Sequence, residues 1–168
     1  AGGVRKLSVF APLKVGVLST GDELINSDED AQKGQIYDAN RQMLLAQLKR
    51  AGFQTIDLGI VKDSPENIRG MLDKAAQNCH ALVTTGGVSS GDEDHMSALL
   101  SSEGRLQIWR IAVKPGRPMA MGLWKGLPIF GLPGNPVAAF VCALVFAQPA
   151  LRVLAGGTWY RPKGYMVP

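Results

Sequence analysis

The chain has 168 residues, of which 46% are hydrophobic and 19% charged, and a formal net charge of +4. This size and apolar content suffice for the core of one domain and exclude wholesale disorder. The longest apolar run, Val137 to Ala147, is much shorter than the roughly 20 residues of a bilayer-spanning helix, so no membrane segment is predicted. Because no signal-peptide pattern is seen and the first residue is not Met, we interpret the chain as a cut piece or a processed product.

Two cysteines, Cys79 and Cys142, are too far apart for a C-x-x-C site and too few for a disulfide framework. They fit a reducing compartment, and we expect the protein to be cytoplasmic. The positive charge is scattered, without a basic run or an aromatic-basic patch. A small anionic ligand explains this charge as well as a nucleic acid does, so nucleic-acid binding ranks last among the functions considered.

Strands and helices are predicted to alternate along the chain. A buried strand is expected at residues 14–19, further strands at residues 53–60, 81–85 and 106–113, and a hairpin at residues 119–124 and 127–132. Helices are expected at residues 40–51, from Pro65 through residue 76, over residues 96–100 with an end near Gly104, and at residues 137–154. This order predicts an α/β fold, a three-layer open and mostly parallel sheet with helices on both faces.

Several local features are also predicted. Residues 20–35 are expected to be too polar to pack, and Asp38 and Asn40 are both candidate N-caps of the first helix. The last helix is apolar nearly all round, so we expect it to be buried and kinked at Pro149. Residues 1–13 are assigned to an N-terminal connecting segment, residues 14–155 to one domain, and residues 156–168 to a linker or the start of a following domain.

Chemically active residues follow the predicted strands at their carboxyl ends, where ligands bind in doubly wound sheets. Glycine-rich loops present N–H groups to oxyanions, cations add charge-assisted bonds, and hard carboxylates suit Mg²⁺. The candidates are Thr20, Gly21, Asp22, Glu23, Asp63, Gly86, Gly87, Ser89, Ser90, Gly91, Asp92, Glu93, Asp94, Lys114, Arg117 and Asn135. We therefore predict that one edge of the sheet binds an anionic ligand together with magnesium.

Three common motifs are rejected. Gly87 to Gly91 has the G-x-S-x-G pattern of a nucleophile elbow, but His95, the only later histidine, is too close in sequence for a triad. Gly86 to Gly91 has Walker-A spacing, but Asp92 stands in the place of the phosphate-binding lysine and would repel phosphate. No G-x-G-x-x-G occurs, and the lack of a His/Cys cluster argues against zinc.

Each candidate residue can also be explained by a purely structural role. Asp22 and Glu23 alone fit a solvated turn, turn chemistry explains Asp63 equally well, and the acids at 92–94 neutralise a helix N-terminus whatever its role. Gly86-Gly87, followed by polar residues, favours ligand binding over a plain tight turn. The functional prediction therefore depends on convergence at one edge of the sheet.

Five segments in order resemble one family. They are Ser19 to Leu24 (STGDEL), Gly34 to Asn40 (GQIYDAN), Thr85 to Ser89 (TGGVS) with Gly91 and Asp94, Lys114 to Pro118 (KPGRP) and Gly131 to Pro136 (GLPGNP). Over Lys14 to about Gly156 the chain is similar to MoeA and the gephyrin E domain, the molybdopterin molybdenumtransferases. Thr84-Thr85 stands where Ser often precedes the Gly pair, which is a conservative departure.

The resemblance implies an activity and a fold like that of the adenylyltransferase MogA. The family inserts molybdenum from molybdate into adenylylated molybdopterin, hydrolyses the adenylyl group and releases AMP, with Mg²⁺ dependence. Residues important in the family match Glu23, Asp63 and Asp94 here, with Pro133 and Pro136 shaping a neighbouring loop. We hypothesise that Asp63 and Asp94 lie nearer the metal and that Glu23 positions water or molybdate.

Substrate-binding residues are expected in the same loops, where glycines and cations would hold the pyrophosphate that links AMP to the pterin. The set is Thr20, Gly21, Gly86, Gly87, Ser89, Ser90, Gly91, Lys114, Arg117, Pro133, Asn135 and Pro136. The resemblance also implies further domains and an elongated homodimer, with the site completed by another domain of the partner. A contact with the adenylyltransferase of the preceding step is a further expectation, and no membrane partner is expected.

Two alternatives remain open at this point. A MogA-like molybdopterin adenylyltransferase would share the fold, but the Gly-Val-Ser sequence after the third strand departs from the Gly-Thr-Gly run associated with that family. A partner-binding scaffold domain is suggested by the gephyrin resemblance, and it ranks lower because no peptide groove is identified in the sequence.

Overall fold

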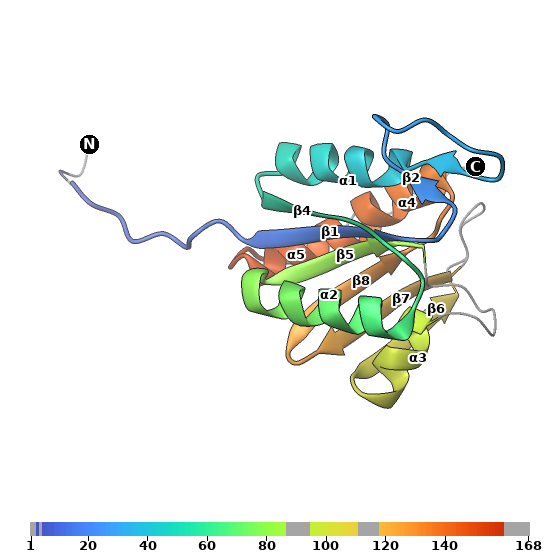
Figure 1. The fold of residues 1–168 in the computed structure, drawn as a ribbon. Coiled ribbons are helices and arrows are strands. Elements are labelled where there is room, and N and C mark those ends of the chain that lie inside the picture. The colour runs from blue at the N-terminus through green and yellow to red at the C-terminus, as the bar shows by residue number, and fades with distance from the viewer. Residues whose placement is uncertain (1–2, 4, 87–94, 111–117, 160–168) are drawn as a thin grey trace, which may run out of the picture.

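A six-stranded sheet forms the centre of the computed structural model, which describes residues 3, 5–86, 95–110 and 118–159. Its strands lie in the order β4 (Gln54–Val61), β1 (Lys14–Thr20), β5 (Ala81–Thr85), β8 (Leu127–Leu132), β7 (Pro118–Trp124) and β6 (Arg105–Arg110) (Figure 1). The first four are parallel neighbours, and β7 is antiparallel to both β8 and β6. The carboxyl ends of the parallel strands and of β6 therefore share one edge of the sheet.

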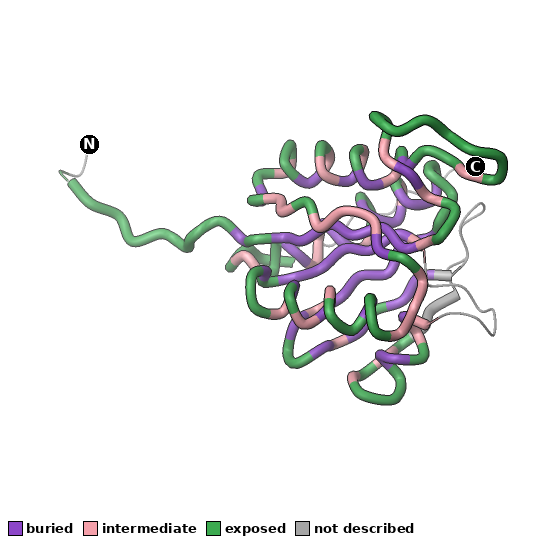
Figure 2. Tube along the Cα trace, viewed as in Figure 1, coloured by how far each residue is buried: buried purple, intermediate pink, exposed green. Residues whose placement is uncertain are grey.

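Helices cover both faces of this sheet, which confirms the predicted three-layer α/β fold (Figure 1). One face packs against α1 (Ala39–Arg50) and the C-terminal helix, and the other against α2 (Pro65–Asn78) and α3 (His95–Ser102). Side chains of β5 alternate between the two cores, with Val83 in the first and Leu82 in the second, as the pleat of a strand requires. The purple trace of the strands in Figure 2 shows that burial is concentrated in this middle layer.

The helix starts follow from local capping chemistry. Of the two candidate caps for α1, Asp38 is the one observed, and its side chain accepts a hydrogen bond from the Arg41 N–H. Ser64 caps α2 by accepting from the Asn67 N–H, with a proline in the first turn, as predicted. Gly52, which follows α1, has a φ of 95°, a conformation that glycine adopts without a steric penalty.

The expectation that residues 20–35 do not pack is wrong. Two short strands, β2 (Leu24–Ile25) and β3 (Ile36–Tyr37), pair in parallel as a separate sheet, and Ile25 is buried. Two-residue strands are too short to leave a hydrophobic alternation, so the sequence pattern does not reveal them. This small sheet turns the polar segment back toward the start of α1.

The expectation that the last helix is wholly buried is also wrong. It consists of α4 (Pro136–Cys142), a π-helical segment η1 (Ala143–Ala147) and α5 (Gln148–Leu154). Its inner residues Ala139, Ala143 and Ala147 are buried in the core, but its outer side exposes large apolar residues. Those residues are Val137, Phe140, Leu144, Val145, Val153 and Leu154. By length and composition alone residues 136–154 could cross a bilayer, but here their inner side forms part of the core.

A π-helical segment directly precedes the turn that contains Pro149, the residue at which the sequence predicts a kink. The Gln148 N–H donates to the Ala143 carbonyl oxygen, which is an i to i−5 bond. Pro149 has no N–H to donate to the preceding turn, so a regular α-helical bond is unavailable at that position. The wider turn accommodates the proline while the apolar inner residues stay on the sheet.

We expect the two thiols to be unreactive in the native protein, because burial raises the pKa of both Cys79 and Cys142. At pH 8, alkylation should be slower than in the denatured chain by on the order of 100-fold. The unfolded chain loses its thiol protons first, so the free energy of unfolding should fall as the pH rises above about 8.5. Mass spectrometry of iodoacetamide-treated protein measures the rates, and a cysteine that is labelled equally fast in both states would contradict its burial.

Candidate functional site

A cavity of about 150 Å³ lies at the edge of the sheet where β1 and β5 end. We call it the strand-end pocket. It is bounded by the end of each of these strands, by β2 and β3, by the first turn of α1 and by the turn that precedes α4. Its lining residues are Thr20, Glu23, Leu24, Ile36, Tyr37, Asp38, Ala39, Asn40, Thr85, Gly86, Gly134 and Pro136.

Gly86 brings the ends of β1 and β5 into close contact. Its φ is 79°, and a Cβ atom at this position would lie 2.3 Å from the carbonyl oxygen of Thr20. No L-residue fits there without a shift of the main chain, because both the conformation and the space require glycine. Thr20 itself is buried, and its Oγ1 has no hydrogen-bond partner within the described part of the chain.

Glu23 enters the pocket from the turn that follows β1. Its carbonyl oxygen accepts a 2.8 Å hydrogen bond from the Ile36 N–H, which joins it to β3. Its carboxylate folds back over Gly21, since a Cβ atom on Gly21 would lie 2.7 Å from Glu23 Oε2. The carboxylate is thus held beside the main chain that leaves β1.

Asp63 lies beside this turn but does not line the strand-end pocket. Its N–H donates a 3.0 Å hydrogen bond to Asp22 Oδ1, and the Gly21 N–H donates to the Val61 carbonyl oxygen at 3.3 Å. The loop after β4 is therefore joined to the turn after β1. The two carboxyl-bearing loops predicted to converge are neighbours at one edge of the sheet.

The turn before α4 forms the opposite wall. Asn135 caps α4 by accepting from the Ala138 N–H at 3.1 Å, and Pro136 occupies the first turn and lines the pocket. The Pro133 carbonyl oxygen accepts a hydrogen bond from Thr85 Oγ1 at 3.4 Å. Pro133, Asn135 and Pro136 thus contribute through the shape of the turn, and Asn135 as a helix cap.

The other predicted site residues lie outside the described part of the chain. They are Gly87, Ser89, Ser90, Gly91, Asp92, Glu93, Asp94, Lys114 and Arg117. Their placement in the site remains a prediction from the sequence.

A buried arginine network supports the pocket, and the sequence analysis missed it. The Arg41 side chain donates to both Asp38 and Asp57 and also to Asn26 Oδ1. Arg41 is 5% exposed, and it ties α1 to β4 and to the residue that follows β2. Burial lowers the pKa of Arg41, but the bonds to Asp57 and Asp38 outweigh it, so the pKa is raised and the guanidinium stays charged. The one feature of the sequence that could have indicated this network is that Arg41 directly follows the Gly34 to Asn40 segment.

The described residues hold no group of three or more His, Cys, Asp or Glu side chains arranged for a metal ion. Asp38 is occupied by Arg41, because its Oδ1 accepts from the main chain and its Oδ2 from the side chain of that residue. Glu23 and Asp63 supply hard oxygen donors on two neighbouring loops, and the predicted third carboxylate, Asp94, lies outside the described ranges. The donor chemistry fits magnesium rather than zinc.

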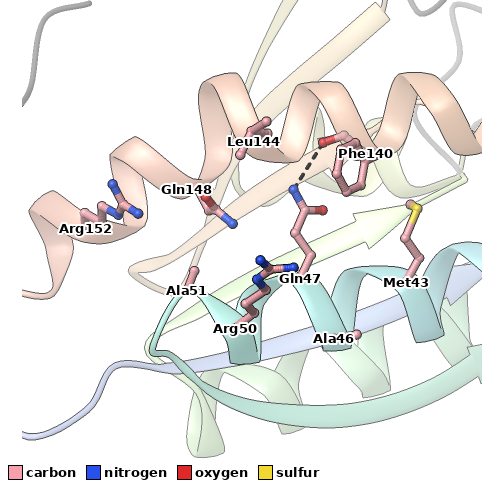
Figure 3. A pocket seen from close by; sticks show the side chains of 9 residues that line it. All are labelled: Met43, Ala46, Gln47, Arg50, Ala51, Phe140, Leu144, Gln148 and Arg152. Carbon is pink, nitrogen blue, oxygen red and sulfur yellow. Dashed lines mark hydrogen bonds between the residues drawn. The ribbon is translucent and has the colours of Figure 1, made fainter.

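A larger cavity of about 550 Å³ lies between α1 and the helix at 136–154 (Figure 3). It is lined mainly by apolar side chains such as Met43, Phe140 and Leu144, with Arg50 and Arg152 at one end. No carboxylate lines it, and it lies away from the strand ends. It therefore lacks the groups needed for hydrolytic or metal chemistry.

Comparison with known proteins relates this site to molybdenum cofactor synthesis. Residues 16–153 match the family described as "Probable molybdopterin binding domain". The chain is 38% identical to a molybdopterin molybdenumtransferase of Haemophilus influenzae, covering 95% of the chain and 40% of that protein. It is 37% identical to one of Nostoc sp., covering 90% of the chain and 36% of that protein. The chain thus spans about two fifths of the curated relatives it matches.

Comparison with solved structures also relates the chain to proteins of molybdenum cofactor synthesis. A molybdopterin biosynthesis MoeA protein from Pyrococcus horikoshii superimposes with a TM-score of 0.76 at 30% identity, over 86% of this chain and 36% of that one. A molybdenum cofactor biosynthesis protein B superimposes with a TM-score of 0.62 at 18% identity, over 89% of this chain and 97% of that one. The second likeness concerns the fold alone.

We expect Arg41→Met to lower the free energy of unfolding by about 3 kcal/mol, because it leaves the buried Asp38 carboxylate without its partner. Urea denaturation measures the change. Arg69→Met is the control, since Arg69 pairs with Glu103 on the surface and its loss should cost less than about 1 kcal/mol. Equal losses in the two variants would contradict a supporting role for the Arg41 network.

We expect Gly86→Ala to destabilise the protein by at least about 2 kcal/mol, because the new methyl group meets the Thr20 carbonyl oxygen in a strained backbone conformation. Gly134→Ala is the matched control in the same pocket. An added Cβ there has open space and no positive φ, so the cost should stay below about 1 kcal/mol. A Gly86→Ala protein as stable as wild type in thermal melts would refute the close approach of β1 and β5.

Proposed function

We propose that this chain, which belongs to the family of probable molybdopterin binding domains, is the substrate-binding domain of a molybdopterin molybdenumtransferase. The reaction would insert molybdenum from molybdate into adenylylated molybdopterin and release AMP. The relatives that carry this name are longer than the chain, so the activity is proposed for the whole protein.

The strand-end pocket is the observation that carries this proposal. Its lining includes the carboxylate-bearing residue Glu23 and a buried hydroxyl, Thr20 Oγ1. This hydroxyl has no hydrogen-bond partner among the described residues. A hydroxyl donor of this kind suits a phosphoryl or molybdate oxygen, because a bound oxyanion would satisfy its unused hydrogen bond. Gly86 lets the end of β5 lie directly against Thr20, since no side chain separates the two main chains.

Each carboxylate would have its own role. Glu23 would orient the attacking water or the incoming molybdate from its position over Gly21. Asp63, beside the same turn, and Asp94 would hold Mg²⁺, which when bound neutralises charge that develops on phosphoryl oxygens. Lys114 and Arg117 would bind the pyrophosphate oxygens by charge-assisted hydrogen bonds, and the net charge of +4 favours an anionic substrate.

Assembly and location belong to the same proposal. We propose a homodimer in which another domain of the partner completes the site, together with a contact to the adenylyltransferase of the preceding step. Family membership alone supports both points. A cytoplasmic location is supported by Cys79 and Cys142, which are free and lie in the cores on opposite faces of the sheet.

A molybdopterin adenylyltransferase is the second candidate, because the chain superimposes on a molybdenum cofactor biosynthesis protein B. Incubation with ATP and molybdopterin distinguishes the two activities. Formation of adenylylated molybdopterin would favour the adenylyltransferase, whereas consumption of adenylylated molybdopterin with release of AMP would favour the transferase. Saturable binding of a partner protein without either reaction would favour the scaffold alternative.

We expect Glu23→Gln in the full-length protein to reduce AMP release by on the order of 100-fold while substrate binding changes little, because the amide keeps the shape but not the charge. Single-turnover assays and calorimetry measure the two quantities. Asp30→Asn is the control, since Asp30 is an exposed carboxylate between β2 and β3 that does not line the pocket. Unchanged turnover of Glu23→Gln would remove Glu23 from the mechanism.

A further inference from the structure

We infer that Asn40 is a positioning residue that holds the walls of the strand-end pocket together, a role that rests on the proposed function of that pocket. Asn40 is the second residue of α1 and lines the cavity. Its carboxamide bonds to two other walls of the pocket, the end of β5 and the turn before α4.

Two hydrogen bonds define this link. Asn40 Nδ2 donates to Thr85 Oγ1 at 2.9 Å and to the Gly134 carbonyl oxygen at 2.7 Å. A primary amide nitrogen carries two N–H groups, so both bonds can form at once. These partners are 45 and 94 residues away along the chain, so the two bonds join the start of α1 to elements that are distant in sequence.

The first bond also determines how Thr85 is oriented. Because Thr85 Oγ1 accepts from Asn40, its own hydrogen is directed to the Pro133 carbonyl oxygen. Thr85 directly precedes Gly86, whose main chain lies against Thr20. A change at position 40 therefore reaches both sides of the cavity through Thr85.

The helix that carries Asn40 is a rigid base. Leu44 and Leu48, one and two turns farther along α1, are fully buried in the core between α1 and the sheet. Asp38 caps the helix and is held by Arg41. The carboxamide thus projects from a fixed start of helix, which is the condition for precise positioning.

The same helix offers a matched control. Gln47 Nε2 donates to the Phe140 carbonyl oxygen at 3.3 Å, so it also joins α1 to α4 through a carboxamide (Figure 3). It lines the larger apolar cavity and not the strand-end pocket. Asn40→Asp and Gln47→Glu therefore make the same chemical change on one helix, once in the pocket and once outside it.

The test compares these two variants in the full-length protein. At pH 8 the new carboxylate of Asn40→Asp cannot donate to Thr85 or Gly134, so kcat/KM for AMP release should fall by on the order of 30-fold. The acceptors at this position favour the neutral form of the new acid, so a larger fraction is protonated at pH 5. The protonated form regains one donor, and the activity relative to wild type should rise. Gln47→Glu should stay within about threefold of wild type at both pH values.

The pH comparison must exclude other titrating groups. Glu23, Asp38 and Tyr37 line the same pocket, and Arg41 is adjacent in sequence. Each variant is therefore expressed as a ratio to wild type at the same pH, which removes titrations that the two proteins share. Asn40→Ala, which has no acid to protonate, should show the loss without the recovery at low pH.

Hydrogen exchange separates this inference from the proposed function. In Asn40→Asp at pH 8, amides of residues 82–86 and 130–136 should exchange faster than in wild type, and in Gln47→Glu they should not. If wild type turns over no adenylylated molybdopterin but this pattern is seen, the proposed function fails and the positioning of the walls by Asn40 stands.

The inference is overturned if Asn40→Asp matches Gln47→Glu in exchange and in activity. It is equally overturned if Asn40→Asp and Asn40→Ala lose activity to the same extent at every pH, because that result would indicate a purely structural loss.

Discussion

The parallel pairing of β1 with β4 and β5 is the constraint on which the rest of the molecule depends. It aligns Thr20 with Val61 on one side and Ser19 with Thr85 on the other, so three chain segments leave the sheet at one edge. Parallel strands must be joined by long crossover connections, and these connections contain α1 and α2. The buried faces of the two helices complete the two cores. The pocket is a consequence of this register, since a slip of one residue would turn every side chain to the other face.

A buried charge network then fixes the segment that carries Glu23. Taking Arg41 out of water is costly, and the bonds to Asp38, Asp57 and Asn26 offset that cost. The network therefore fixes the geometry of this segment more than it raises the stability of the protein. Asn40 and Arg41, adjacent in sequence, thus join the start of α1 to two strands, Asn40 to the end of β5 and Arg41 to β4.

The fold was accessible from the sequence because its elements are long and strongly patterned. The apolar stripe of α2, with Ile68, Leu72 and Ala75 buried, and the Ser64 cap are local properties of the chain. The errors occurred where local pattern is uninformative. Ile25 lies in a two-residue strand, and Phe140 and Leu144 are exposed on a helix whose composition matches that of a buried one. Whether an apolar helix is covered on one side or all round depends on its neighbours.

The sequence by itself determined the alternation of strands and helices, the caps and the order of the motif segments, because these features are encoded within a few neighbouring residues. It also indicated that Thr20, Glu23, Gly86 and Pro136 belong to one edge, and the structure brings these four to one cavity. Only the tertiary structure decided that Asn40 reaches Thr85 and Gly134, and that Arg41 reaches Asp57. Such contacts join residues far apart in the chain, and their distances depend on how whole elements pack, which no local pattern contains.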